Sequence, residues 1–181
     1  MKILAISGSP RNGNSEFLLD TILNQAKENG NQTEKILIKE KNIQFCDGCL
    51  TCAGGKAPCP VKDDMQEIYE KIKNSDALLF ASPVWYDMIT PYLLNFIVRL
   101  NCVQANLKNK KFAFIVLGQR DGDYSDKSLG TASNYLKQIA KLYEMNLVDS
   151  LIIKGVRNEK DAKEKEEVIE KCKQLANKII S

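Results

Sequence analysis

Short apolar runs alternate along the chain with longer segments whose apolar residues recur every three to four positions. The short runs are typical of strands buried on both faces, and the longer segments have the one-sided pattern of amphipathic helices. The predicted strands are Lys2–Ser7, Thr33–Ile38, Asp76–Ala81, Lys111–Leu117 and Leu147–Ile153. The predicted helices are Ser15–Asn29, Asp63 to about Asn74, Pro91 to about Leu100, about Lys127 to Glu144, and a last helix that includes Val168–Ile179.

Residues typical of helix ends mark three of these boundaries. Gly30 follows the first predicted helix, where glycine accepts a left-handed backbone. Asp63, with Gln66 three residues later, predicts a capping box at the start of the second helix. Thr90 is a suitable N-cap for a helix that begins at Pro91, since proline is favoured at the first helical position. The boundary residues therefore agree with the periodicity.

The alternation of strands and helices predicts an α/β fold, a parallel sheet with helices on both faces. Five such units fit a doubly wound, flavodoxin-like strand order of 2-1-3-4-5, with a cysteine-rich loop at residues 43–62 after the second strand. A length of 181 residues predicts one domain, residues 1–181. Ligands bind such sheets at the carboxyl ends of strands one and three, which here are Ser7 and Ala81.

The composition narrows the chemistry. A net charge of +3 gives no reason to expect a nucleic-acid partner or an acidic membrane surface. No apolar stretch approaches the roughly 20 residues that span a bilayer, and the apolar run at the N-terminus is too short for a signal peptide. We therefore expect a cytoplasmic protein whose thiols are kept reduced. The sequence contains no histidine, which excludes histidine acid–base catalysis and any Ser–His or Cys–His nucleophile pair.

The segment after the first predicted strand has donors for one phosphate. It reads GSPRNGNS and leads into a helix, whose positive N-terminal end favours an anion. The predicted phosphate contacts are Ser9, Arg11, Asn14 and Ser15. The segment lacks the lysine of a P-loop and does not match the G-x-G-x-x-G dinucleotide fingerprint. A single phosphate on a doubly wound sheet predicts FMN, and the alternative is a plain turn between strand and helix.

The segment after the third predicted strand contains the only tryptophan of the chain. The flavin ring is predicted to lie along Pro83, Val84, Trp85 and Tyr86, with Gly118, after the fourth strand, as a third wall. Backbone amides of this segment would bond the pyrimidine edge of the ring, and an aromatic side chain would shield one face. The alternative is that Trp85 and Tyr86 are core or interface aromatics.

Four cysteines have the spacing C-x2-C-x2-C-x6-C. They are Cys46, Cys49, Cys52 and Cys59. Three closely spaced thiolates would surround one side of a [4Fe–4S] cluster, and the fourth would return from the other side after a turn at Gly54 and Gly55. Structural zinc, whose ligands usually form two separated pairs, and unmetallated or redox-active thiols are the alternatives. The remaining cysteines, Cys102 and Cys172, are predicted to fill the core.

These motifs together resemble the NADPH-dependent FMN reductase branch of the flavodoxin-like fold. With the cysteine motif added, the chain is similar to the iron–sulfur flavoproteins of anaerobic archaea and bacteria. The resemblance implies one FMN per subunit, a [4Fe–4S] cluster on the four cysteines, and a homo-oligomer, often a tetramer, with dimer as the alternative. It also implies that the cluster of one subunit lies close to the flavin of a neighbour.

The resulting hypothesis is a flavin-dependent oxidoreductase that contains FMN and a [4Fe–4S] cluster. It would pass electrons from a low-potential donor, ferredoxin or NAD(P)H, to a two-electron acceptor, and by resemblance oxygen, peroxide and quinones are possible acceptors. No catalytic side chain is predicted. The first alternative is a cluster-free NAD(P)H-dependent FMN or quinone reductase. The second is a non-catalytic electron carrier or zinc-stiffened binding module.

Overall fold

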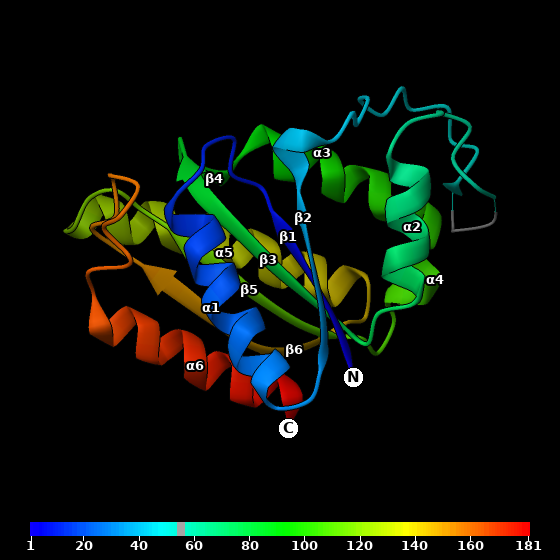
Figure 1. Ribbon diagram of the computed structural model, residues 1–181. Coiled ribbons are helices and arrows are strands. Elements are labelled where there is room, and N and C mark those ends of the chain that lie inside the picture. Colours follow the sequence, from blue (N-terminus) through cyan, green and yellow to red (C-terminus); the bar gives the residue numbers. More distant parts are fainter. Residues whose placement is uncertain (54–56) are drawn as a thin grey trace.

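A parallel sheet forms the centre of the molecule, and its strands follow the predicted order (Figure 1). The computed structural model describes residues 1–53 and 57–181, so the turn expected at Gly54 and Gly55 lies outside the described residues. The parallel strands are β1 (Lys2–Ser7), β2 (Gln32–Leu37), β3 (Ala77–Trp85), β5 (Lys111–Leu117) and β6 (Asn146–Ile153). Their order, β2-β1-β3-β5-β6, is the flavodoxin-like order 2-1-3-4-5, which confirms the predicted fold class.

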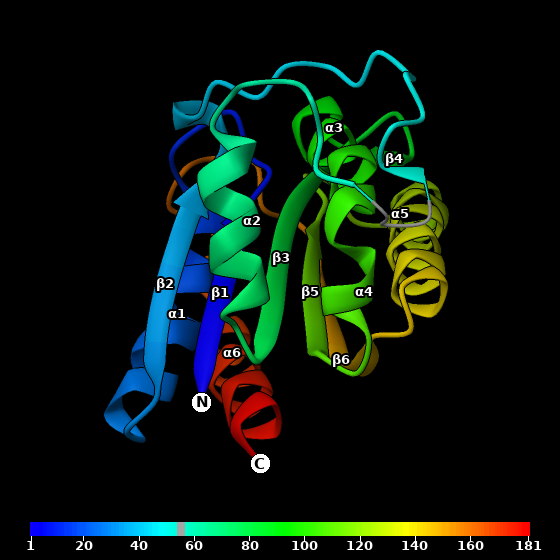
Figure 2. The same ribbon diagram turned by 90° about the vertical axis from the view of Figure 1, so that its right-hand side faces the viewer.

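Helices cover both faces of this sheet (Figures 1 and 2). One face carries α1 (Asn14–Glu28) and α6 (Glu166–Ile180). The other carries α2 (Met65–Lys73), α3 (Pro91–Arg99), the turn η3 (Leu100–Val103), α4 (Gln104–Leu107) and α5 (Asp123–Leu142). A short turn, η1 (Ile38–Glu40), follows β2. Among the helices that the structure describes, none has both the length and the apolar composition to cross a lipid bilayer.

The central strands are apolar at successive positions because each of their faces packs against a helix layer. In β1, Leu4 and Ile6 belong to the core under α2, α3 and α5, whereas Ile3 and Ala5 belong to the core under α1 and α6. This alternation is the period of two expected for a strand, here with both faces buried. The two-sided burial fixes the register that brings the carboxyl ends of the strands to one edge.

The third strand extends further than predicted. It continues past Ala81 to Trp85 and turns back as the short antiparallel strand β4 (Met88–Ile89). Tyr86 and Asp87 form the two-residue connection with φ of 46° and 67°, the left-handed backbone that a tight hairpin needs. The segment predicted to follow the third strand is therefore part of a hairpin. Pairing with β5 carries the strand through its proline, which local sequence patterns do not reveal.

The helix starts confirm one capping prediction, correct another and move one predicted helix boundary. The Thr90 hydroxyl accepts a hydrogen bond from the N–H of Leu93 at 3.3 Å, as expected for an N-cap. The predicted capping box is wrong, because Gln66 donates to the carbonyl of Val61 at 2.8 Å and the Asp63 carboxylate pairs with an arginine. Helix α5 begins at Asp123 and not near residue 127, with two aspartates in its first turn.

Candidate functional site

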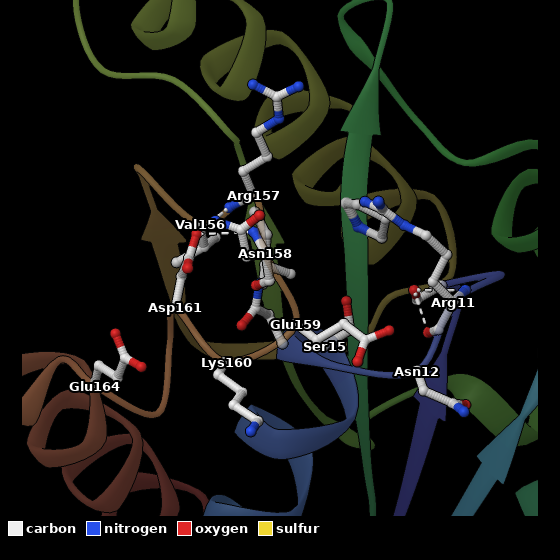
Figure 3. A pocket seen from close by; sticks show the side chains of 14 residues that line it. Arg11, Asn12, Ser15, Val156, Arg157, Asn158, Glu159, Lys160, Asp161 and Glu164 are labelled. Carbon is white, nitrogen blue, oxygen red and sulfur yellow. Dashed lines mark hydrogen bonds between the residues drawn. The ribbon is translucent and has the colours of Figure 1, made fainter.

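Two adjoining cavities open at the carboxyl edge of the sheet. The larger, about 670 Å³, lies between the N-terminus of α1 and the segment after β6 (Figure 3). The smaller, about 490 Å³, lies between the β3–β4 hairpin and α5. Pro83 and Leu117 line the larger cavity, and the residues that follow them, Val84 and Gly118, line the smaller one. The two cavities therefore meet along the ends of β3 and β5.

The structure brings every predicted cofactor residue to one of these cavities. The larger cavity is lined by the predicted residues Ser9, Arg11, Asn14, Ser15 and Pro83. The smaller cavity is lined by the predicted residues Val84, Trp85, Tyr86 and Gly118. The two groups come from segments far apart in sequence, and the parallel register, which pairs Ser7 with Ala81, places them side by side.

The N-terminus of α1 has the features of an anion site. Gly13 is the N-cap with φ of 129°, and no side chain caps the helix. A Cβ at Gly13 would lie 3.0 Å from the Cα of Glu159, so only glycine fits this turn without strain. Ser15, 5% exposed, places its hydroxyl in the first turn, next to N–H groups that have no partner within the helix. These groups are suitable donors for a phosphate.

Two of the predicted phosphate donors already have partners within the chain. The Ser9 hydroxyl donates to the carbonyl of Arg11 at 2.8 Å and accepts its N–H at 3.2 Å. The Asn14 side-chain amide donates to the carbonyl of Asn158 at 2.7 Å and accepts the N–H of Ala162 at 3.0 Å. In this arrangement Asn14 fastens the segment after β6 to the loop after β1. Of the four predicted phosphate contacts, Arg11 and Ser15 are therefore the ones left to face an anion.

The segment after β6 is a wall of the larger cavity that the sequence analysis missed. Arg157, Asn158 and Lys160 line the cavity from this side (Figure 3). The Asp161 carboxylate accepts the N–H groups of Asn158 at 2.8 Å and Arg157 at 2.7 Å, and these bonds lower the pKa of Asp161. The sequence carries a signal for this wall, because the predicted strand that became β6 ends at the same edge as β1 and β3.

The smaller cavity has an exposed aromatic rim. Trp85 is 40% exposed and Tyr86 is 99% exposed, so neither is a core residue. Tyr124 of α5 lines the opposite wall. Asp87 has a buried carboxylate oxygen, Oδ1, for which no partner is found in the described part of the chain. Tyr86 and Asp87 also hold left-handed backbone conformations that are costly for residues other than glycine, a feature often found at functional sites.

The four motif cysteines line a third and much smaller cavity, at the C-terminal end of α3. Its volume is about 20 Å³, close to that of a single water molecule. Cys59 is 7% exposed and Cys52 is partly buried, whereas Cys46 and Cys49 are exposed. Within residues 1–53 and 57–181, no three cysteine, histidine or acidic side chains approach metal-binding geometry. The thiols therefore suit a soft metal centre chemically, and they would have to come closer together to ligate one.

Cys102 is not only a core residue, which corrects part of the sequence analysis. It packs against the core and also lines the cysteine cavity. Burial raises the pKa of the Cys102 thiol to about 11, and the thiol of Cys52 is among its neighbours. The other cysteine outside the motif, Cys172, is fully buried in α6, as predicted.

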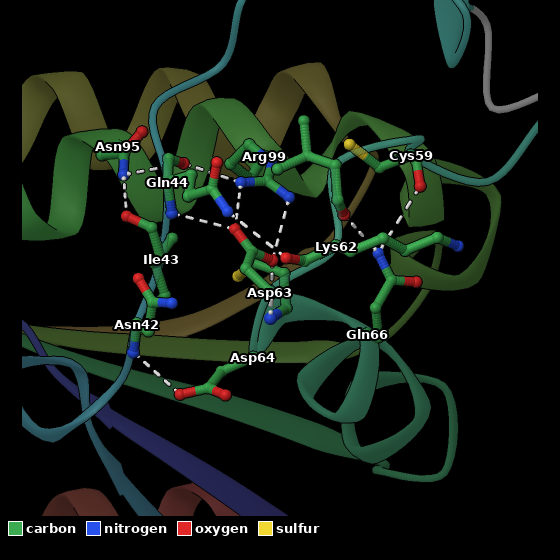
Figure 4. Close-up of polar contacts among 12 residues, drawn as sticks. Asn42, Ile43, Gln44, Cys59, Lys62, Asp63, Asp64, Gln66, Asn95 and Arg99 are labelled. Atoms are coloured by element: carbon green, nitrogen blue, oxygen red, sulfur yellow. Dashed lines mark hydrogen bonds and ion pairs between the residues drawn. The ribbon is translucent and has the colours of Figure 1, made fainter.

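The ends of the cysteine loop are joined by a buried ion pair (Figure 4). Arg99 Nη1 donates to Asp63 Oδ2 at 2.7 Å, and Nη2 donates to Oδ1 at 3.1 Å. Arg99 Nη1 also donates to the carbonyl of Gln44 at 2.7 Å. Burial opposes ionisation of Asp63, but the hydrogen bond from Arg99 and two backbone N–H groups leave the pKa of Asp63 below its usual value. The pair is therefore fully charged at neutral pH.

Comparison with known proteins assigns the family. Residues 1–155 match the family model described as NADPH-dependent FMN reductase. The chain is 31% identical, over 99% of its length and 94% of the relative, to an iron–sulfur flavoprotein of Archaeoglobus fulgidus.

Solved structures support the fold. The apo form of an NADH:FMN oxidoreductase has a TM-score of 0.72 at 18% identity, covering 98% of this chain and 87% of that one. Oxidised flavodoxin 1 from Bacillus cereus has a TM-score of 0.66 at 17% identity, covering 99% and 97%. From the family match, the relative and the geometry of the sheet edge, we conclude that the chain belongs to the NADPH-dependent FMN reductase family, among the iron–sulfur flavoproteins, and is a flavin-dependent oxidoreductase.

Proposed function

We propose that this protein carries FMN across the two adjoining cavities and a [4Fe–4S] cluster on Cys46, Cys49, Cys52 and Cys59. It would pass electrons between a low-potential donor, ferredoxin or reduced nicotinamide, and a two-electron acceptor. The proposal of bound FMN is supported by one observation: all nine predicted contact residues line these cavities. We further propose that it acts in the cytoplasm as a homo-oligomer, a tetramer or a dimer.

The cavities fit FMN in donor chemistry and in size. In the larger cavity, Ser15, Arg11 and the first N–H groups of α1 would hold the phosphate. In the smaller cavity, Val84 and Gly118 would supply backbone contacts, and Trp85 would cover the ring. Each volume lies within the several hundred Å³ usual for ligand sites. The residues of this chain would bind and orient the cofactor and exclude water, and we assign no side chain as a general acid or base.

The cysteine loop fits a cluster by its ligand type. Thiolates are the usual ligands of iron–sulfur clusters, and all four motif cysteines line one cavity. FMN exchanges one or two electrons and the cluster exchanges one, so their combination would connect one-electron donors with two-electron acceptors. Helix α3 links the two sites, since Thr90 at its start donates to the carbonyl of Gly8 at 2.6 Å and Arg99 at its end lines the cysteine cavity. A helix of nine residues spans about 14 Å.

The test is the iron, sulfide and flavin content of protein purified without exposure to air. We expect about four irons and four sulfides per chain, with one FMN, and a visible spectrum that combines flavin bands with a broad iron–sulfur shoulder. Flavin without iron would contradict the cluster and leave the cluster-free NAD(P)H-dependent FMN or quinone reductase as the function. A colourless zinc protein would contradict both.

The cluster-free reductase has one observation in its favour. In the described part of the chain the cysteines do not form a ready-made metal site, and Cys46 and Cys49 are exposed to solvent. In that case the loop would be a lid, and the flavin site would be unchanged. Titration of the anaerobic protein with NADH or NADPH separates the two functions, because only the cluster-containing protein would take up more electrons than one FMN can hold.

A further inference from the structure

We propose that Arg99 is a positioning residue for the cysteine site: it closes the neck of the cysteine loop and presents the buried positive charge that faces the thiols. We define the neck as the contacts that join residues 42–44 to residues 63–64. The role of the charge rests on the proposed cluster, but the closing of the neck rests on contacts within the chain.

Arg99 is an unusual side chain in its environment. It is 2% exposed and is among the largest fully buried side chains of the molecule. A buried arginine is costly unless it is paired and hydrogen-bonded. Burial disfavours the charged form of Arg99, yet the paired carboxylate of Asp63 keeps the pKa of Arg99 above its usual value. Arg99 therefore carries a permanent charge at a buried position, where an apolar side chain would be usual.

The partners of Arg99 show what this charge holds in place. Gln44 lies two residues before Cys46, and Asp63 lies four residues after Cys59. The guanidinium binds the carbonyl of the first and both carboxylate oxygens of the second. Asp63 Oδ2 in turn accepts the N–H of Gln44 at 2.8 Å. One bidentate ion pair therefore joins the segment that enters the cysteine loop to the segment that leaves it.

Further contacts support this neck (Figure 4). The N–H of Asn42 donates to the Asp64 carboxylate at 2.7 Å, and the N–H of Asp64 donates to the carbonyl of Asn42 at 3.1 Å. Asn95, one turn before Arg99 on α3, donates to the carbonyl of Ile43 at 3.2 Å. Closing the two ends against α3 removes much of the conformational freedom of the chain between them.

Arg99 also belongs to the lining of the cysteine cavity, together with Cys52 and Cys59. Its Nε is buried, and the described residues offer it no hydrogen-bond partner. An unpartnered donor beside converging thiols is suited to an acceptor that carries negative charge, such as a thiolate or a thiolate-bound cluster. Net charge and hydrogen bonds to sulfur set the reduction potential of such a cluster. Arg99 would therefore raise that potential, since its charge favours the reduced and more negative form.

Replacement of Arg99 by methionine and by lysine tests the closing of the neck and the effect of the charge separately. Arg99→Met removes the bidentate hydrogen bonds and the charge, whereas Arg99→Lys keeps the charge but cannot form the bidentate hydrogen bonds. A double variant, Arg99→Met with Asp63→Asn, leaves no unpaired buried charge and keeps the test valid if the single variant does not fold. Lys178→Met is the control, because Lys178 forms an exposed ion pair with Asp149, away from the cysteine loop.

The first measurement is iron loss to a chelator and the midpoint potential of the anaerobic holoprotein. Outer contacts of metal ligands usually change affinity by about 10–100-fold, and we expect Arg99→Met to lose iron faster by that factor. Its potential should be more negative than that of the wild type, whereas Arg99→Lys should lose iron faster with a potential near the wild-type value. Wild-type iron retention and potential in Arg99→Met and in the double variant would overturn the proposal.

The second measurement uses the protein without iron. We would follow alkylation of individual cysteines by iodoacetamide with mass spectrometry. Cys59 should react roughly tenfold or more faster in Arg99→Met, because the neck opens. Cys172, fully buried in α6, should stay unlabelled and report an intact fold. Unchanged protection of Cys59 would overturn the closing of the neck. If the wild-type protein itself takes up no iron, the proposed cluster fails while this measurement still decides whether Arg99 positions the loop.

Discussion

Two regions of the molecule are held in place by different means. One is the carboxyl edge of the sheet with its two adjoining cavities, which we call the flavin edge, and the other is the cysteine loop. At the flavin edge, the predicted contact residues lie in or after the ends of β1, β3 and β5, whose register is set by a sheet buried on both faces. The cysteine loop extends beyond the sheet, as Figure 1 shows, and its ends are joined by one buried ion pair, Arg99–Asp63. The first site is therefore positioned by the buried sheet, and the second depends on a small group of polar contacts centred on this ion pair.

This difference has a consequence for how each site tolerates change. Many strand and helix contacts share the positioning of Ser15, Pro83 and Gly118, so no single polar contact decides their location. At the cysteine loop, loss of either charge of the pair leaves the other buried without a partner. We expect substitutions at the loop to have large and local effects, and substitutions of single polar groups at the flavin edge to have smaller ones.

The largest expected effect is loss of the cluster on removing one motif thiol. Cys49→Ala should abolish iron binding and leave FMN bound, because the two sites are held by separate parts of the chain. Iron, sulfide and flavin analysis of the anaerobic protein measures both. Cys172→Ala, which removes a core cysteine outside the motif, should keep its iron. Full iron content in Cys49→Ala would mean that Cys49 is not a ligand.

The second effect is on folding. Asp63→Ala leaves Arg99 charged and buried without its partner, and the free energy of unfolding should fall by about 3–5 kcal/mol. Urea denaturation followed by circular dichroism measures the change. Asp149→Ala breaks the exposed pair with Lys178 and should cost about 0–1 kcal/mol. Equal losses in the two variants would contradict the contrast between the buried pair at the cysteine loop and an exposed pair elsewhere.

A smaller effect is expected at the phosphate end of the flavin edge. Arg11→Ala should weaken FMN binding by about 1.5–3 kcal/mol, through loss of a charge-assisted hydrogen bond. Asn14→Ala should weaken it less, because its amide is bonded to Asn158 and Ala162. Fluorescence titration of the apoprotein with FMN compares the two. A larger effect of Asn14→Ala would mean that the segment after β6, and not Arg11, controls binding.

The smallest expected effect is in the acid stability of the protein. The pKa of Asp63 lies below its usual value of 3.8, so its ion pair stabilises the fold above about pH 4, and this contribution is lost as the pH falls through the lowered folded-state pKa. Below about pH 4, the free energy of unfolding should therefore fall less steeply with decreasing pH in Asp63→Asn than in the wild type. Parallel acid titration curves for the variant and the wild type would show that the pair is not the source of this dependence.

Much of the fold and of the flavin edge could be predicted from local patterns. Apolar runs, helix periodicity and residues such as Thr90 and Pro91 are imprints of burial and backbone geometry, so they identify the elements and the strand order. Once the order is known, the rule that carboxyl ends of parallel strands meet at one edge leads to Ser9 and Trp85. The same rule, applied to the last strand, would have found Arg157.

Other features were decided only by the tertiary structure. The hairpin at Tyr86 depends on pairing between β3 and its neighbour, and the bonds of Asn14 reach residues 158 and 162. Arg99 gave no local signal, because its charge on an otherwise apolar helix end has meaning only beside Asp63 and Gln44. The sequence by itself determined the elements, their order and the spacing of the four thiols. Which distant polar groups meet was decided by folding, since contacts between side chains far apart in the chain depend on the final register and packing and leave no periodic pattern in either segment.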